Sequence, residues 1–207
     1  MKMQRPNNSS VLTRRTLLAV ALAGAALAGA VPAVRAQKAE FTLADVMALL
    51  AQRKSGEARF TEERFVSTFS DPLRSSGTLS FTAPDRFVRQ TLEPRPESME
   101  VQGNNLVLKR GGRTRQLALD AIPEVAALVE AVRGTLSGNA AALQKYFRVA
   151  VSGQAGKWVL VLTPIDNKLL AQVMQIEIVG QNADLRSIAL ALGGGDRSLM
   201  LIDAPSK

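Results

Sequence analysis

The stretch Ser98–Leu119, SMEVQGNNLVLKRGGRTRQLAL, decides what kind of fold this chain can adopt. Two turn signals, Gly103-Asn104 and Gly111-Gly112, divide it into three short strand-like segments. Pairs of Gly with Asn or Gly are typical of short β-hairpin turns. Strands joined by such turns pair antiparallel, because parallel strands need long crossover connections. The stretch therefore predicts an antiparallel meander of three strands, at Ser98–Gln102, Leu106–Lys109 and Arg113–Leu119.

Further strand-like segments lie on both sides of this meander, separated by Gly, Pro, Asn, Asp and Ser. Before it they are Glu57–Phe69, Thr78–Thr82 and Arg86–Leu92. After it they are Phe147–Val151, Trp158–Leu162, Met174–Val179, Leu185–Leu192 and Ser198–Ile202. Roughly ten antiparallel strands are too many for a flat sheet, because large twisted sheets curl.

Three segments have helical periodicity instead. Thr42 and Asp45 form a variant of the capping box before an apolar stripe that continues to about Lys54. Asp120 is placed to cap an amphipathic helix at Pro123–Arg133, which Gly134 is expected to end. Asn139 is expected to cap a short helix that ends near Tyr146.

Together these elements predict an α+β chain that is mainly β, with a strongly curved antiparallel sheet, an incomplete open barrel, and helices plugging its concave side. Trp158–Leu162 is apolar at both strand parities, so we expect it to be covered on both faces. The apolar stripe of Pro123–Arg133 also needs a surface to cover, and the concave side offers one. A helix-plugged apolar cavity follows, and such cavities commonly hold a hydrophobic ligand.

The composition excludes several kinds of chemistry. The 207 residues contain no His and no Cys. Catalysis through a Ser-His-Asp triad or a thiolate is therefore excluded, as are His-ligated or Cys-ligated metals and iron–sulfur clusters. Glu62 and Glu63 are adjacent on a strand, so their carboxylates point to opposite faces. We expect a protein that is not an enzyme and that uses no cofactor and no metal.

The N-terminus carries the three parts of a secretory signal peptide. A basic start is followed by the apolar run Leu17–Val34 and by small or short residues before a cleavage site after about Ala36. Arg14 and Arg15 resemble the twin-arginine export motif, with general secretion as the alternative route. A retained membrane anchor is the alternative to cleavage, since the run is near spanning length. The predicted organisation is a signal peptide at 1–36 and one domain at 37–207 in the periplasm.

Export also changes the meaning of the basic charge. The chain has 26 basic and 18 acidic residues, a net charge of +8. Five of the basic residues and no acidic ones lie in the signal, which leaves 21 against 18 and a net charge of +3. The main argument for nucleic-acid binding is thereby lost, and no nucleic-acid partner is expected.

The sequence resembles the periplasmic outer-membrane lipoprotein carrier family, LolA, as a divergent branch. The similar segments cover nearly all of Phe41–Ile202: Ala58–Glu63, Ser76–Phe81, Pro84–Arg89, Leu136–Phe147, Trp158–Pro164, Ile176–Ile178 and Gly194–Arg197. The resemblance implies an incomplete antiparallel barrel, closed by helices, whose cavity accepts acyl chains. Family members usually carry a basic residue just before the proline that corresponds to Pro84. Here that position is Ala83, which favours a relative that handles another lipid or acylated molecule.

Candidate lipid-binding residues lie on the predicted strands and on the amphipathic helix. They are Phe81, Phe87, Met99, Val101, Leu106, Leu108, Val125, Leu128, Val129 and Met174. The alternative for each strand residue is ordinary core packing, and for the helix a permanent place in the core. If the helix is a lid, its stripe covers the empty cavity and moves when an acyl chain enters.

Candidate residues for docking a headgroup or a partner are Arg86, Arg89 and Arg113. The alternative for Arg86 and Arg89 is a solvated strand face. Arg113 lies with Arg110 and Arg115 at the Gly111-Gly112 turn, where three arginines can steer a protein to an anionic membrane or simply solubilise a hairpin.

These observations predict a periplasmic carrier that binds acyl chains of a lipoprotein or other lipid and transfers them between membranes. An inner-membrane donor and an outer-membrane acceptor are expected, with the carrier itself a monomer. The alternative is a lipid-responsive sensor or an assembly subunit of an envelope complex, which uses the same fold to bind a partner. A carrier releases its cargo to an acceptor, whereas a sensor changes its affinity for a partner.

Overall fold

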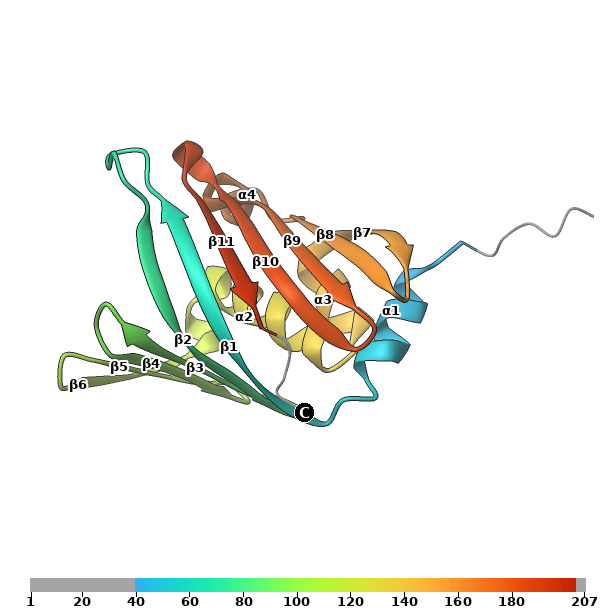
Figure 1. Ribbon diagram of the computed structural model, residues 1–207, viewed down its shortest axis with the longest axis horizontal. Helices are drawn as coiled ribbons and strands as arrows, with labels where there is room; N and C mark the ends of the chain where they lie inside the picture. The colour runs from blue at the N-terminus through green and yellow to red at the C-terminus, as the bar shows by residue number, and fades with distance from the viewer. Residues whose placement is uncertain (1–39, 204–207) are drawn as a thin grey trace, which may run out of the picture. The chain divides into compact units, whose positions relative to one another are not determined.

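The computed structural model of the protein describes residues 40–203, and the predicted signal peptide at 1–36 lies outside them. Eleven strands of this part form one antiparallel sheet. They are β1 (Ser55–Phe65), β2 (Leu73–Thr82), β3 (Arg86–Glu93), β4 (Glu97–Gln102), β5 (Asn105–Arg110), β6 (Arg113–Ala118), β7 (Phe147–Gln154), β8 (Lys157–Pro164), β9 (Val173–Gln181), β10 (Asp184–Leu192) and β11 (Arg197–Ile202). The sheet is strongly curled and open, as Figure 1 shows. The predicted fold class is confirmed.

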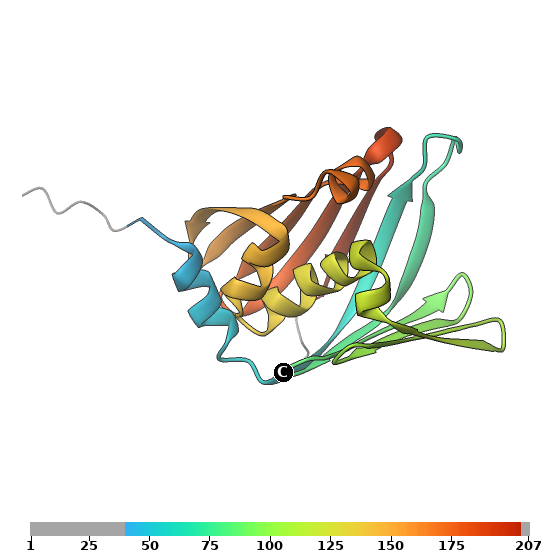
Figure 2. The same ribbon diagram turned by 180° about the vertical axis from the view of Figure 1, so that it is seen from behind.

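Two meanders make up the sheet, the first formed by β1 to β6 and the second by β7 to β11, with strand order β6-β5-β4-β3-β2-β1-β11-β10-β9-β8-β7. The first and last strands of the described residues join them: β1 pairs antiparallel with β11 from Phe60 opposite Ile202 to Phe65 opposite Arg197. Strands β6 and β7 are therefore the two edges of the sheet. The chain that connects these edges passes along the concave side and carries two helices there (Figure 2).

Four α-helices accompany the sheet in the described residues: α1 (Leu43–Leu50), α2 (Pro123–Leu136), α3 (Ala140–Tyr146) and α4 (Asn167–Gln172). Two short 3₁₀ segments lie at Leu119–Ala121 and Gly193–Gly195. The predicted caps of two helices are confirmed: Thr42 and Asp45 form a reciprocal capping box, and the Asn139 side chain accepts from the Ala142 N–H at 3.1 Å. None of the helices in residues 40–203 is long and apolar enough to cross a membrane.

Helix α2 differs from its prediction at both ends. Asp120 lies in the 3₁₀ segment and does not cap the helix, whose N-cap residue, Ile122, offers no side-chain acceptor. At the other end the helix continues through Gly134. A Cβ at Gly134 would lie 3.1 Å from Leu143 Cδ2, so glycine there lets α2 approach α3 closely. The glycine that follows the helix in left-handed conformation is Gly138, with φ of +68°.

Other corrections concern the strands and one helix that was not expected. Strand β1 ends at Phe65 and not at Phe69, because the chain turns there and the Phe69 N–H donates to Val66 O at 2.9 Å. Helix α4, capped by Asp166, was not predicted, since six residues carry too little periodicity. Strand β8 alternates between buried and half-buried residues, so Trp158–Leu162 is fully covered on one face only.

The buried side chains form two clusters. The larger one joins α1, α2 and α3 to β7, β8 and β9, and Phe147, Trp158 and Ile178 lie within it. The smaller one lies where the first half of α2 meets β4 and β5, around Val101 and Leu106. Helix α2 therefore packs against both clusters: Ala127 and Ala131 belong to the larger one, and Ala126 and Val129 belong to the smaller one.

The capping box of α1 makes stability depend on pH. The Asp45 carboxylate accepts from the Thr42 N–H at 2.8 Å and from Thr42 Oγ1 at 2.7 Å. The backbone hydrogen bond, followed by the side-chain one, lowers the pKa of Asp45 below its ordinary value of 3.8. The stabilisation is therefore complete above that pH and is lost as the pH falls through the lower pKa of the folded state.

We expect the stability difference between the wild type and Asp45→Asn to shrink below about pH 3.8. Urea unfolding at a series of pH values measures this difference. A difference that stays constant down to pH 2 would contradict the role of the ionised carboxylate.

Candidate functional site

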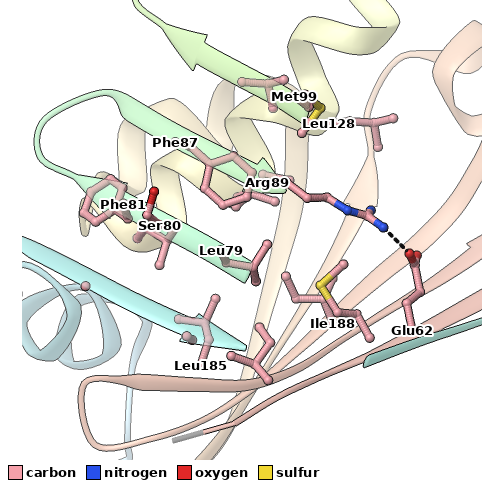
Figure 3. Close-up of a pocket in the computed structure, with 18 of the residues that line it drawn as sticks. Glu62, Leu79, Ser80, Phe81, Phe87, Arg89, Met99, Leu128, Leu185 and Ile188 are labelled. Carbon is pink, nitrogen blue, oxygen red and sulfur yellow. Dashed lines mark hydrogen bonds and ion pairs between the residues drawn. The ribbon is translucent and has the colours of Figure 1, made fainter. Parts of the chain in front are cut away.

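A cavity of about 340 Å³ lies between α2 and the concave face of the sheet. Strands β1 to β4 of the first meander and β9 to β11 of the second contribute lining side chains. Figure 3 shows Leu79, Phe81 and Phe87 on one side of this space and Leu185 and Ile188 on another. Helix α2 lines the cavity over most of its length, from Val125 to Leu136.

Six of the ten candidate lipid-binding residues line this cavity: Phe81, Phe87, Met99, Val125, Leu128 and Val129. Three come from the first meander and three from α2. The three strand residues lie on β2, β3 and β4. Phe81 on β2 lies opposite Phe87 on β3, and Phe87 lies opposite Val101 on β4. The helix residues lie along one side of α2, as their spacing predicts.

Three other candidates lie in the smaller core cluster and not in the cavity. Val101 and Leu106 are almost fully buried, and Leu108 packs against them. Ala126 and Val129 of α2 and Leu119 before it belong to the same cluster. The prediction that these three strand residues line the cavity is corrected, because the first half of the helix already covers them.

Met174 also lies outside the cavity, since its side chain is 55% exposed. Its neighbour Val173 is buried instead. The register of β9 with β10 shifts between Ala191 and Leu192, which pair with Gln175 and Val173. Strict alternation from the buried Ile176 would have placed Met174 on the inner face of the sheet. The irregularity places it on the outer face instead.

Several lining residues were not predicted as binding residues. They are Leu79, Leu136, Ile176, Leu185, Ile188, Leu190 and Ile202. The alternation of Leu79 with Phe81 was a signal that could have found the first. The strands of the second meander were predicted correctly, but nothing local indicated that they face the same cavity as β2 and β3.

An ion pair lies in this largely apolar lining. Arg89 Nη2 on β3 donates to Glu62 Oε2 on β1 at 2.6 Å, and the two side chains are 26% and 13% exposed. The Arg89 guanidinium lies over the Phe60 ring, 4.7 Å from its centroid. Ser75 Oγ donates to the same Glu62 oxygen at 3.3 Å. Of the three candidate docking arginines, Arg89 alone lines the cavity.

The other two docking candidates lie away from it. Arg86 alternates with Phe87 and pairs with Glu100 at 2.9 Å, with 45% of its side chain exposed. Arg113 is exposed at the turn after β5, directly opposite Arg110 in the register. A headgroup held in the cavity would therefore meet neither of them.

Helix α2 is tied to the first meander by polar contacts. Arg133 Nη1 donates to Gly103 O at 2.7 Å, and its other terminal nitrogen pairs with Glu130. The same turn also bonds to the segment before the helix: the Leu119 N–H donates a hydrogen bond to Asn104 O at 2.8 Å. The hairpin signal in the sequence thus marks the place where the helix is anchored.

An open, curled antiparallel sheet with a helix across its concave side and an apolar cavity between them defines a class of proteins whose fold encloses a cavity. Within that class, the chain belongs to the outer membrane lipoprotein carrier protein LolA-like family, whose model matches residues 33–205. The family resemblance in the sequence is confirmed. No curated protein matches the sequence of this chain.

Solved structures similar to this chain include a LolA superfamily protein from Nitrosomonas europaea, with 11% identity, a TM-score of 0.42, and 79% of this chain and 92% of that chain covered. The lipoprotein LppX from Mycobacterium tuberculosis has 9% identity, a TM-score of 0.35, and coverage of 80% and 97%. The MucA/MucB complex of Pseudomonas aeruginosa has 13% identity, a TM-score of 0.37, and coverage of 80% and 58%.

Proposed function

We propose that this protein binds the acyl chains of a lipoprotein or another lipid in the cavity beneath α2 and carries them between membranes. The observation that carries the proposal is the apolar cavity itself. Its volume of about 340 Å³ lies within the usual range for ligand pockets, and Leu, Ile, Val, Phe and Met side chains dominate its lining. No catalytic step is part of the proposal.

The partial exposure of several lining residues supports an acyl ligand. Leu79, Leu128 and Ile188 line the cavity and are only half-buried. A hydrocarbon chain that enters would cover their remaining apolar surface as well as its own. Each Å² of apolar surface removed from water contributes roughly 25 cal/mol. Met99 and Met200 lie in the same lining, and methionine adapts its shape to varied ligands.

The location and partners extend this proposal. The family is named after an outer-membrane lipoprotein carrier protein. The first 36 residues of this chain have the pattern of an export signal. We therefore place the mature protein, from about residue 37, in the periplasm as a monomer. An inner-membrane donor would load it and an outer-membrane acceptor would unload it.

The test is native mass spectrometry, with lipid extraction, on the mature protein purified from the periplasm without detergent. The expected result is a bound mass that contains an acyl chain. Transfer is then measured from fluorescent donor vesicles to unlabelled acceptor vesicles. An apo mass with no uptake of offered lipid would overturn the proposal and favour the partner-binding alternative. Binding without transfer would favour a lipid sensor.

The proposal includes the movement of α2 as a lid over the cavity. Substitution of Arg133 tests this movement. Arg133→Ala removes both the hydrogen bond to Gly103 O and the pairing with Glu130, and loss of the charged hydrogen bond alone costs about 2 kcal/mol of unfolding free energy. Because this contact ties α2 to the first meander, uptake of a fluorescent fatty acid should become several-fold faster. Stopped-flow fluorescence measures the rate.

Arg110→Ala is the matched control for this lid test. Arg110 pairs with Glu97 but its side chain is 71% exposed, so little change in stability or uptake is expected. An unchanged uptake rate in a destabilised Arg133→Ala protein would show that α2 does not move when the ligand enters.

A further inference from the structure

The Glu62–Arg89 pair is a feature of the cavity that acyl-chain binding does not explain. It is the more buried of two ion pairs in the lining, since the Arg53–Asp184 pair is more exposed. Both side chains line the cavity, and both are more than 70% buried. Figure 3 shows Arg89 extending from β3 past Leu128 toward Glu62. Strand β2 lies between β1 and β3, so the pair reaches across a whole strand and is not a contact between neighbours.

Stability alone is a weak reason for such a pair. Two charges taken out of water carry a desolvation penalty that their mutual attraction often fails to offset. Hydrophobic residues of similar volume in these places would often be neutral or stabilising, and they would also bind a hydrocarbon chain better. Charges kept inside an apolar cavity therefore point to a ligand that carries charge.

The surroundings of Arg89 suit it to hold a second anion. The Phe60 ring lies 4.7 Å from the guanidinium and stabilises the cation. The contact with Glu62 joins one nitrogen to one oxygen, whereas a guanidinium carries five N–H donors in a planar fork. That fork matches the geometry of a carboxylate or a phosphate.

Glu62 is suited to give up the contact. Its Oε2 also accepts from Ser75 Oγ, so the carboxylate keeps a hydrogen bond when Arg89 turns toward a ligand. Glu62 pairs with the guanidinium and so prevents an unpaired charge in a largely apolar space. The pair thus has the properties of a site that is self-occupied until an anionic group arrives.

We propose that Arg89 binds an anionic group of the cargo, a carboxylate or a phosphate, while the attached hydrocarbon chain lies in the cavity between α2 and the sheet. Glu62 holds Arg89 when the cavity is empty and competes with the ligand. This inference rests on the proposed acyl-binding function and adds the chemical class of the ligand's polar end.

The test compares three probes that share one chain length: hexadecanoate, hexadecyl phosphate and hexadecanol. Competition with a fluorescent fatty-acid analogue gives the affinity of the mature protein for each. We expect the wild type to bind at least one anionic probe about tenfold more tightly than hexadecanol, since a charge-assisted hydrogen bond is worth at least that factor. Which anionic probe binds more tightly identifies the group as carboxylate or phosphate.

Variants assign the preference to the pair. Arg89→Met should remove the anion preference and leave hexadecanol affinity within about twofold. Glu62→Gln should raise the affinity for the anionic probe, because the competing charge is gone. The double variant Glu62→Gln with Arg89→Met avoids an unpaired buried carboxylate and serves if the single variant fails to fold. Arg86→Met, on the other face of β3, is the control and should keep the preference.

Each outcome decides a different claim. Equal binding of all three probes by the wild type would overturn the anion site and leave acyl binding standing. A preference that survives in Arg89→Met, or in the double variant, would also overturn it. Failure of the wild type to bind any probe would overturn the proposed function, and this inference with it.

Discussion

Leu128→Glu is expected to weaken acyl-chain binding by about a hundredfold in a protein that still folds. Leu128 lines the cavity from α2 and is half-buried. Figure 3 shows it next to Arg89. A carboxylate there either stays unpaired beside the hydrocarbon chain or pairs with Arg89. In both cases an ion is desolvated when the ligand enters, which costs several kcal/mol, and each 1.4 kcal/mol is tenfold in affinity.

Met174→Glu is the matched control, because it places the same charge on a Met side chain that is already 55% exposed outside the cavity. Binding is measured by displacement of a fluorescent fatty acid, and circular dichroism confirms that both variants fold. The control should bind like the wild type. Unchanged affinity in a folded Leu128→Glu protein would show that α2 does not form a wall of the binding site.

Gly180→Ala is expected to be the most destabilising of the single-residue changes considered. Gly180 on β9 pairs with Trp158 on β8, and a Cβ at this glycine would lie 2.0 Å from Trp158 Cζ2. The Trp158 ring is fully buried, and its Nε1 donates to Asn182 O at 2.9 Å. The ring therefore has no free direction in which to move without losing that hydrogen bond or its packing.

The expected cost is about 3 kcal/mol, the upper part of the usual range for overpacking a core. For a domain of this size it corresponds to roughly 10 °C in Tm. Gly156→Ala is the control, since a Cβ at Gly156 meets nothing within 4 Å, and its effect should stay within about 0.5 kcal/mol. Equal losses in the two variants, measured by urea unfolding, would contradict the steric argument.

Much of the fold could be predicted because its signals are local. The turn at Gly103-Asn104, the capping box at Thr42 and the cap at Asn139 each act over a few residues. Helix α2 was found from its periodicity, although its end was misplaced at Gly134. The error has a physical reason: Gly134 does not end the helix but allows close contact with Leu143 of α3. No local sequence pattern reveals such a contact.

The candidate site was predicted less completely, for a related reason. Alternation along a strand determines which residues share a face, but not what covers that face. Phe87 and Val101 are partners in the register, yet Phe87 lines the cavity and Val101 is buried under α2. Where the helix crosses the sheet decides between cavity and core, and this crossing depends on distant contacts such as that of Arg133 with Gly103.

By itself, the sequence determined the strands, the turns between neighbours, the amphipathic helix and the family, because these depend on side chains close together along the chain. The tertiary structure alone decided that β1 pairs with β11, which brings Met200 and Ile188 to the same cavity as Phe81. It also decided that Arg89 meets Glu62 across β2. Both depend on how far the sheet curls, and curling sums small twists over many strands, a quantity that no short stretch of sequence specifies.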